Sequence, residues 1–208
     1  VTSRILTASM STIHAATNSQ GVLDSVPGAG ATDLRKNRAA LNNIILTATG
    51  AARALEEVLP AIRHIGFLAD SVRVPTTTVS LVNLNLTFHS SVGPDGEPTV
   101  TRAVINDIYR RAAAEAHKDL LVYTDRQSVS ADLIGLKASV VIEGHETHTR
   151  LGFLHIPPEA LGNAGSSAPS DLRIPVSHAK VFGWYDNEFG SYVYSLGELV
   201  GYLSRSLV

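Results

Sequence analysis

One stretch near the start of the sequence combines residue types that could hold an anion beside a base. His14 lies at the end of a predicted short strand, and Thr17, Ser19 and Gln20 follow it in a polar segment. An imidazole acts as a general base near neutral pH, and hydroxyl and amide groups can bind an anion next to it. The structural alternative is a histidine that only caps a strand, so this stretch predicts a site only together with others.

Two other positions could bind an anion through a helix start or a guanidinium group. Thr49 and Gly50 precede a helical pattern, whose free N–H groups could hold phosphate. Arg73 lies between apolar residues just before Pro75, so it is either solvated at a strand end or directed at an anion. An ordinary helix cap at Thr49 is the alternative reading of the first position.

The remaining polar clusters are weaker indications of a site. Arg35, Lys36 and Arg38 are typical of a solvated helix face. His145 and His148 are three residues apart, but no third ligand is evident, so we predict no metal site. The segment 185–190 places polar residues between aromatic ones before a helix. It suggests a site loop only in combination with the other motifs.

Apolar spacing predicts an α+β fold without a repeat. Strands recur in consecutive groups, which favours a mixed, largely antiparallel sheet covered on one face by helices. A long loop is expected over 17–31, and 157–169 is loop-rich, but 143–175 as a whole gives no clear assignment. The expected strands are 9–15, 65–74, 77–88, 120–123, 139–143 and 174–185, and the expected helices are 33–47, 49–59, 101–117 and 193–207.

Composition indicates one globular domain and excludes several classes of function. The 208 residues are 44% hydrophobic and 17% charged, with a net charge of -2. This near-neutral balance gives no field for nucleic acid, and no apolar run is long enough to span a membrane. No leader or disulfide framework is evident, so we expect a cytoplasmic protein.

Two absences limit the chemistry that these residues can perform. The sequence contains no cysteine, which excludes a cysteine nucleophile within residues 1–208. It also contains no Gly-x-Gly-x-x-Gly or P-loop pattern, so we expect no Rossmann domain in this chain. A dinucleotide, if one is used, is then bound mainly by another domain.

Four separated motifs together resemble the catalytic domain of the glyceraldehyde-3-phosphate dehydrogenase family. The sister family of erythrose-4-phosphate dehydrogenases shares this likeness, which covers nearly the whole chain. The motifs are Thr12-Ile13-His14-Ala15, Asn43-Ile44-Ile45 leading to Thr49-Gly50-Ala51-Ala52, Val72-Arg73-Val74-Pro75-Thr76 and Trp184-Tyr185-Asp186-Asn187-Glu188-Phe189-Gly190.

The resemblance assigns a role to each group of candidate residues. His14 would be the general base that activates a cysteine thiol and assists hydride transfer. The substrate phosphate would be bound by Thr17, Ser19 and Arg73, inorganic phosphate by Thr49 and Gly50, and the nicotinamide side of the cofactor by Asn187 and Glu188.

The same resemblance implies a reaction and partners. A phosphorylated aldehyde would form a thiohemiacetal with the cysteine, hydride would pass to NAD or NADP, and inorganic phosphate would release an acyl phosphate. The 17–31 loop would pack near a neighbouring subunit, which implies a homo-oligomer, by resemblance a tetramer. The family cysteine and nucleotide-binding domain would precede Val1, so residues 1–208 alone are expected to be an inactive catalytic domain.

Two departures from the family pattern bear on these assignments. Ser19 stands where threonine is usual, which keeps the hydroxyl, whereas Ser191 replaces a common tyrosine near the cofactor loop. The alternatives are a free-standing pseudo-enzyme that binds a phosphorylated ligand or partner, and an interaction module that only keeps the fold.

Overall fold

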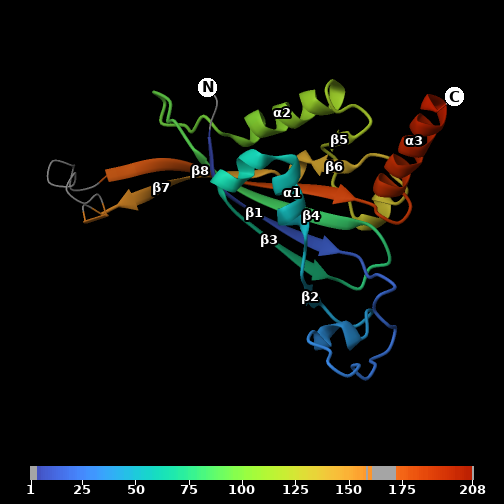
Figure 1. Ribbon diagram of the computed structural model, residues 1–208. Helices are drawn as coiled ribbons and strands as arrows, with labels where there is room; N and C mark the ends of the chain where they lie inside the picture. Colours follow the sequence, from blue (N-terminus) through green and yellow to red (C-terminus); the bar gives the residue numbers. More distant parts are fainter. Residues whose placement is uncertain (1–3, 158, 161–171, 208) are drawn as a thin grey trace.

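The computed structural model describes residues 4–157, 159–160 and 172–207, and it is organised around one eight-stranded sheet. Figure 1 shows the sheet crossing the molecule, with α1 and α2 against it and α3 at one end. The strands are β1 (Ile5–His14), β2 (Ile45–Thr47), β3 (Gly66–Arg73), β4 (Ser80–His89), β5 (Leu121–Thr124), β6 (Val140–Glu143), β7 (His148–Ile156) and β8 (Leu172–Tyr185). The helices are α1 (Ala51–Val58), α2 (Arg102–Ala114) and α3 (Ser191–Ser206), and the short 3₁₀ helices are η1 (Leu34–Asn37), η2 (Pro60–His64), η3 (Ser130–Leu133) and η4 (Gly144–Glu146).

The strand order is β2-β3-β1-β4-β8-β6-β5, with β7 paired to β8. β1 runs parallel to β3, and β5 runs parallel to β6. The other described pairs, β1–β4, β2–β3, β4–β8, β6–β8 and β7–β8, are antiparallel. The expected mixed, largely antiparallel α+β sheet is therefore confirmed.

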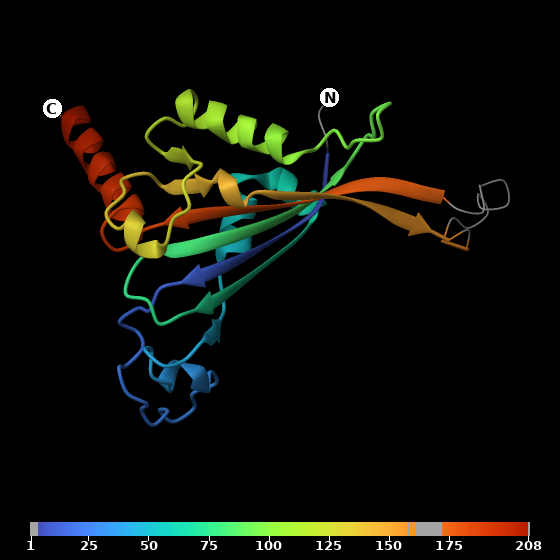
Figure 2. The same cartoon turned by 180° about the vertical axis from the view of Figure 1, so that it is seen from behind.

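One of the two core clusters lies on the face of the sheet that α2 covers. Leu86 and Phe88 of β4 pack with Ala179 and Val181 of β8 against Ile105 of α2. α1 lies in front of the sheet in Figure 1 and behind it in Figure 2, so helices cover this face. Alternate side chains of the same strands point to the opposite face. That face, the open face of the sheet, contains polar side chains and two hollows, and the second core cluster, Val79, Leu133, Ala138 and Val141 with Trp184, covers part of it.

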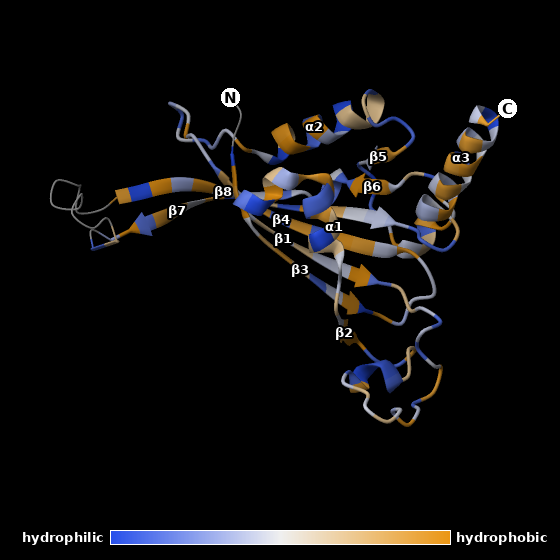
Figure 3. Cartoon of the chain, in the orientation of Figure 1, coloured by the Kyte–Doolittle hydropathy of each residue, from blue (hydrophilic) through white to orange (hydrophobic). Residues whose placement is uncertain are grey.

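Apolar side chains on the last helix remain exposed. The predicted helix over 193–207 is confirmed as α3, and Figure 3 shows apolar stretches along its projecting length. Val193, Leu196 and Val200 are 50%, 48% and 59% exposed. The expected apolar stripe thus forms but is not covered by the described part of the chain.

The prediction of a helix over 33–47 is wrong. Asp33 accepts a hydrogen bond from the Arg35 N–H, as a cap would, but only the short η1 follows. Leu41 and Ile44 are 50% and 74% exposed, so no surface is available to bury a longer amphipathic helix. Buried Ile45 instead begins β2, which adds to the sheet edge through backbone bonds to β3.

Strand β7 was not predicted from the sequence. It lies in the unassigned 143–175 region and forms a long hairpin with the first half of β8, which projects from the body in Figures 1 and 2. Both faces of β7 are largely accessible, so it lacks the alternation of a half-buried strand. Of the loop-rich 157–169 segment, 158 and 161–169 lie outside the described residues. In the described ranges, no helix has the length and apolarity needed to cross a membrane.

Candidate functional site

Four strand ends meet at one edge of the sheet and bring the main candidate residues together. His14 ends β1 and lies opposite Arg73, which ends the parallel strand β3. Ser80 begins β4 on the other side of β1 and lies opposite Tyr185, which ends β8. The site therefore depends on strand register, because a slip of one residue would turn each side chain to the other face.

Three of the predicted phosphate ligands form one hydrogen-bonded cluster. Arg73 Nη1 donates to Thr17 Oγ1 at 2.6 Å and to the Ala15 carbonyl oxygen at 3.3 Å. Thr17 Oγ1 lies 2.8 Å from Ser19 Oγ. The guanidinium group and both hydroxyls can contact one phosphate group, for which charge-assisted hydrogen bonds are the strong ones.

A small cavity of about 140 Å³ adjoins this cluster. Arg73 and Ser19 line it together with Arg35 and Lys36 of η1. The sequence had suggested that these two cations lie on a solvated helix face. The structure turns them toward the cavity because the 17–44 segment folds back to the sheet through β2. Asp33 lines the cavity too and pairs with Arg35 at 2.9 Å, so Lys36 is the cation that adds to the charge of Arg73.

The imidazole of His14 is held in an orientation suited to a base. Its Nδ1 lies 3.0 Å from the Ala15 carbonyl oxygen. A carbonyl oxygen only accepts, so this hydrogen bond requires the proton on Nδ1 and leaves the Nε2 lone pair free. The Tyr185 ring meets the imidazole edge to face at a centroid distance of 6.0 Å and an angle of 81°.

Tyr185 itself stays protonated near neutral pH. Burial raises the pKa of its hydroxyl, and a hydrogen bond with Ser80 and the charge of Arg73 offset only part of that rise. Ser80 Oγ also accepts the Ala15 N–H at 3.1 Å. Ser80 thus links the Tyr185 side chain to the segment that holds His14.

The loop that carries Asn187 and Glu188 is organised by a buried carboxylate. Asp186 is 2% exposed, and its Oδ1 accepts the N–H groups of Glu188 and Phe189 at 3.0 and 3.1 Å. Thr78 Oγ1 donates to the same oxygen at 2.9 Å, and the Gly135 N–H donates to Oδ2 at 2.7 Å. Burial alone would raise the pKa of Asp186, but these hydrogen bonds outweigh it and lower the pKa.

Two small residues close the same loop. The Ser191 hydroxyl accepts the Asp186 N–H at 2.8 Å, so the serine found here in place of a tyrosine has a structural role. A Cβ atom at Gly190 would collide with the Leu136 carbonyl group. That carbonyl oxygen accepts the Ser191 N–H at 2.9 Å, which requires the close approach that only glycine permits.

Val79 lies between the Asp186 loop and the segment that holds His14, and its backbone is strained. It lies between Thr78 and Ser80, is 4% exposed, and has a φ of 61°. That conformation is an outlier for a β-branched residue and persists only when its surroundings impose it. Here the Thr78–Asp186 and Ser80–Ala15 hydrogen bonds hold it on both sides.

Thr49 and Gly50 lie apart from the Arg73 cluster. Gly50 is the N-cap of α1, and Thr49 Oγ1 accepts the Ala51 N–H at 3.1 Å. No hydrogen bond joins either residue to Arg73 or Thr17 among the described residues. β2 runs antiparallel to β3, with Ile45 opposite Arg73, so the chain leaves the Arg73 edge before it reaches Thr49.

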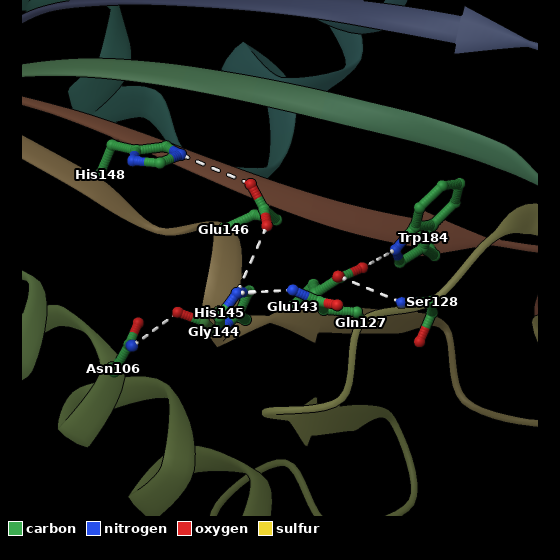
Figure 4. Close-up of polar contacts among 9 residues, drawn as sticks. All are labelled: Asn106, Gln127, Ser128, Glu143, Gly144, His145, Glu146, His148 and Trp184. Carbon is green, nitrogen blue, oxygen red and sulfur yellow. Dashed lines mark hydrogen bonds and ion pairs between the residues drawn. The ribbon is translucent and has the colours of Figure 1, made fainter.

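His148 lies on the open face opposite Lys180, and His145 lies in η4 just before it. Glu146 lies between them, with His145 Nε2 at 3.9 Å and His148 Nε2 at 3.5 Å from its carboxylate oxygens (Figure 4). His145 Nε2 also contacts Gln127 Nε2 at 2.9 Å. Across the described ranges, no group of three His, Cys, Asp or Glu residues is placed to hold a metal ion.

The sequence reasoning missed several residues that shape the site. Asp186 and Tyr185 lie inside the fourth motif, but the sequence predicts no role for them, and it predicts Ser80 and Thr78 only as strand residues. A hydroxyl side chain at the start of an apolar strand does not by itself indicate a functional site. The density of polar residues in 185–190 was the one indication that some of them face inward.

The fold is α+β, and the candidate site places a histidine next to a cluster of one arginine and two hydroxyl side chains at one sheet edge. Residues 2–155 match the family model described as "Glyceraldehyde 3-phosphate dehydrogenase, C-terminal domain". The chain therefore belongs to the family of glyceraldehyde-3-phosphate dehydrogenase C-terminal domains.

Curated relatives agree with this membership. The chain is 35% identical over 183 residues to the glyceraldehyde-3-phosphate dehydrogenase of Borreliella burgdorferi, which covers 87% of this chain and 44% of that protein. It is 36% identical over 182 residues to glyceraldehyde-3-phosphate dehydrogenase 1 of Streptomyces avermitilis, covering 87% of this chain and 43% of that protein. It is 35% identical over 196 residues to glyceraldehyde-3-phosphate dehydrogenase 1 of Bacillus cereus, with shares of 94% and 47%. The chain spans less than half the length of these relatives.

Proposed function

We propose that this chain is the catalytic half of an NAD(P)-dependent enzyme that oxidises glyceraldehyde 3-phosphate, or a similar phosphorylated aldehyde, to an acyl phosphate. The observation that carries the proposal is the Arg73–Thr17–Ser19 cluster one strand away from His14. A base beside a site for a phosphate dianion suits a substrate with a phosphate group at one end and a reacting carbonyl at the other. Family membership supports the same reaction class.

In the proposed reaction, one group of residues in this chain would bind the substrate phosphate and His14 would transfer the proton. Arg73, Thr17 and Ser19 would anchor the substrate phosphate and so fix the position of the aldehyde carbon. His14 Nε2 would take the proton from the attacking thiol. It would then donate a hydrogen bond to the substrate oxygen as charge develops there.

The attacking inorganic phosphate would bind at Thr49 and Gly50. The N–H groups at the start of α1 and the Thr49 hydroxyl suit such an anion, although Thr49 now bonds to Ala51. The separation of this pair from Arg73 fits two phosphate positions rather than one.

The nucleophile and most of the cofactor site would come from outside residues 1–208, since the sequence has no cysteine and no dinucleotide motif. NAD or NADP, when bound, accepts the hydride. The half-buried Asn187 fits the cofactor's carboxamide because its amide offers both a donor and an acceptor on a loop fixed by Asp186. Glu188 shapes that loop. We further propose a cytoplasmic homo-oligomer, a tetramer by resemblance, in which residues 1–208 alone are inactive.

The experiment that tests the proposal replaces His14 by Asn in the intact enzyme. Loss of the base should slow the chemical step by about 10²–10⁴-fold and leave cofactor affinity unchanged, measured as single-turnover formation of reduced cofactor. His178→Asn, on the open face, is the matched control and should keep the wild-type rate. An unchanged rate in His14→Asn would rule out the assigned base.

The absence of cysteine also keeps a second function in view, a pseudo-enzyme that binds a phosphorylated ligand or partner. It uses the same Arg73 cluster but predicts no activity in any form of the protein. Turnover of a phosphorylated aldehyde by the intact protein would reject this second function.

A further inference from the structure

The direction of the His14 imidazole is set by two neighbours within the described residues. Nδ1 bonds to the Ala15 carbonyl oxygen at 3.0 Å, and the Tyr185 ring packs edge to face against the imidazole. The part of the chain that the structure describes gives this imidazole no further hydrogen bond, ion pair or ring contact. Whatever holds Ala15 and Tyr185 in place therefore also determines where Nε2 points.

Both of these neighbours bond to one buried hydroxyl group. Ser80 is 3% exposed, and its Oγ accepts the Ala15 N–H at 3.1 Å. The Ser80 O–H then remains to donate to the Tyr185 hydroxyl oxygen. Burial raises the pKa of Tyr185, and this hydrogen bond lowers it in part, as expected when the tyrosine oxygen is the acceptor. One oxygen atom thus supports the imidazole through two separate neighbours.

The backbone around Ser80 leaves its hydroxyl little freedom to move. Val79, the residue before it, is buried and has a φ of 61°, a conformation that a β-branched residue keeps only where its surroundings impose it. Ser80 itself begins β4 and lies directly opposite Tyr185 in the antiparallel pairing with β8. The hydroxyl is therefore held at a fixed point between the two strand ends.

The Ala15 peptide also connects to the Arg73 cluster, but that connection is not the main one. Its carbonyl oxygen accepts Arg73 Nη1 at 3.3 Å as well as His14 Nδ1. Arg73 has a shorter hydrogen bond to Thr17, at 2.6 Å, whereas Nδ1 of the imidazole has no second acceptor in the described ranges. A displaced Ala15 peptide should therefore disturb the base more than the arginine.

We propose that Ser80 is a positioning residue for the base, holding the Ala15 peptide and the Tyr185 ring so that His14 Nε2 keeps the direction needed to take a proton. Ser80 acts through these two neighbours and lies outside the four sequence motifs. The inference rests on the proposed role of His14 as the general base.

The first test compares Ser80→Ala with the wild type in the intact enzyme. Without the hydroxyl, the Ala15 N–H loses its acceptor and Tyr185 loses its bond, so the imidazole can rotate. We expect the single-turnover rate of cofactor reduction to fall about tenfold, with KM for the phosphorylated aldehyde within about twofold of wild type. Ser80→Thr, which keeps a hydroxyl, should recover most of the rate. A wild-type rate in Ser80→Ala would overturn the proposal.

Ser177→Ala is the matched control for the loss of a buried hydroxyl. Ser177 also lies in the sheet, is fully buried, and its Oγ donates to Ser90 Oγ at 2.9 Å, away from the His14 edge. This variant should lose stability as Ser80→Ala does but keep the wild-type rate. Equal losses of rate in the two variants would show that the Ser80 hydroxyl serves only the fold, and the proposal would be wrong.

A double-mutant cycle shows whether Ser80 acts through His14. In the His14→Asn background, the further change Ser80→Ala should alter the remaining rate by less than about twofold, because residues that act as a unit are not additive. A full tenfold loss in that background would overturn the proposal. The cycle also separates the two hypotheses, since a wild-type rate in His14→Asn alone rejects the proposed function, whereas a slow His14→Asn beside a fast Ser80→Ala rejects only the role of Ser80.

Two further measurements cover the Arg73 route and a variant that does not fold. With an aldehyde that lacks the phosphate group, the rate loss in Ser80→Ala should persist. A loss confined to the phosphorylated aldehyde would place the effect on Arg73 and overturn the proposal. Tyr185→Phe removes the bond to Ser80 but keeps the ring, so it replaces Ser80→Ala if that variant does not fold. Its rate should fall about threefold, and an unchanged rate would then count against Ser80 as the support of the base.

Discussion

The two halves of the candidate site are held in different ways. The Arg73 cluster is half-buried, with Ser19 exposed, and its contacts join groups that a phosphate could itself bind. The Asn187 loop is held from beneath by Asp186, whose hydrogen bonds a ligand cannot replace. The comparison indicates that the Arg73 cluster, the proposed phosphate side, can exchange its internal hydrogen bonds for bonds to a ligand, while the Asn187 loop, the proposed cofactor side, is fixed by the fold.

The variant with the largest expected effect is Asp186→Ala, which tests whether Asp186 fixes the Asn187 loop. It leaves the Gly135, Glu188 and Phe189 N–H groups and the Thr78 hydroxyl without their acceptor. We expect a loss of about 3 kcal/mol in the free energy of unfolding, measured by urea denaturation with an unchanged slope. Asp107→Ala on the exposed face of α2 should cost less than about 0.5 kcal/mol. A similar small loss for Asp186→Ala would contradict a fixed loop.

The second prediction concerns pH and uses the lowered pKa of Asp186. Because the folded pKa lies below the unfolded value of about 3.9, this carboxylate stabilises the fold above that value. The contribution is lost as pH falls through the folded pKa. Melting curves of wild type and Asp186→Asn should differ by a constant amount above about pH 5 and converge below about pH 4. Curves that stay parallel at all pH values would show that Asp186 is not ionised in the fold.

On the phosphate side, Arg73→Ala should remove ligand binding without a large change in the fold. For the wild type, phosphate at ten times its dissociation constant should add about 1.4 kcal/mol of stability, seen as a higher melting temperature. Arg73→Ala should lose most of this increment, and Arg150→Ala on the exposed β7 should keep it. Equal increments for both variants would show that phosphate binds elsewhere.

The smallest expected effect is that of Ser19→Ala. Ser19 is exposed and its hydroxyl contacts Thr17, so one hydrogen bond to the ligand is at stake. We expect phosphate binding to weaken by about 0.5–1 kcal/mol with no change in unfolding free energy. Calorimetric titration of the wild type and variant provides the measurement. A change as large as that of Arg73→Ala would mean that Ser19, not the guanidinium group, dominates the site.

The long strands were predictable from the sequence because their apolar residues alternate or run continuously. The 66–73, 80–89 and 172–185 strands all fell within or close to their expected ranges. The prediction of a helix over 33–47 was wrong because the helical spacing of Leu34, Leu41 and Ile44 does not show whether a surface exists to bury them. β7 was not predicted because backbone pairing with β8 forms it without a buried face, and therefore without an alternating apolar pattern.

The same division holds within the site. The sequence by itself determined the residue types, a histidine at a strand end, an arginine before a proline and a polar turn between aromatics, because each is a local pattern. Only the tertiary structure decided that His14 faces Arg73, that Asp186 supports the Asn187 loop, and that Arg35 and Lys36 line the anion cavity. Those relations depend on strand register and on chain segments far apart in sequence. Packing of the whole sheet fixes them, and no local spacing encodes that packing.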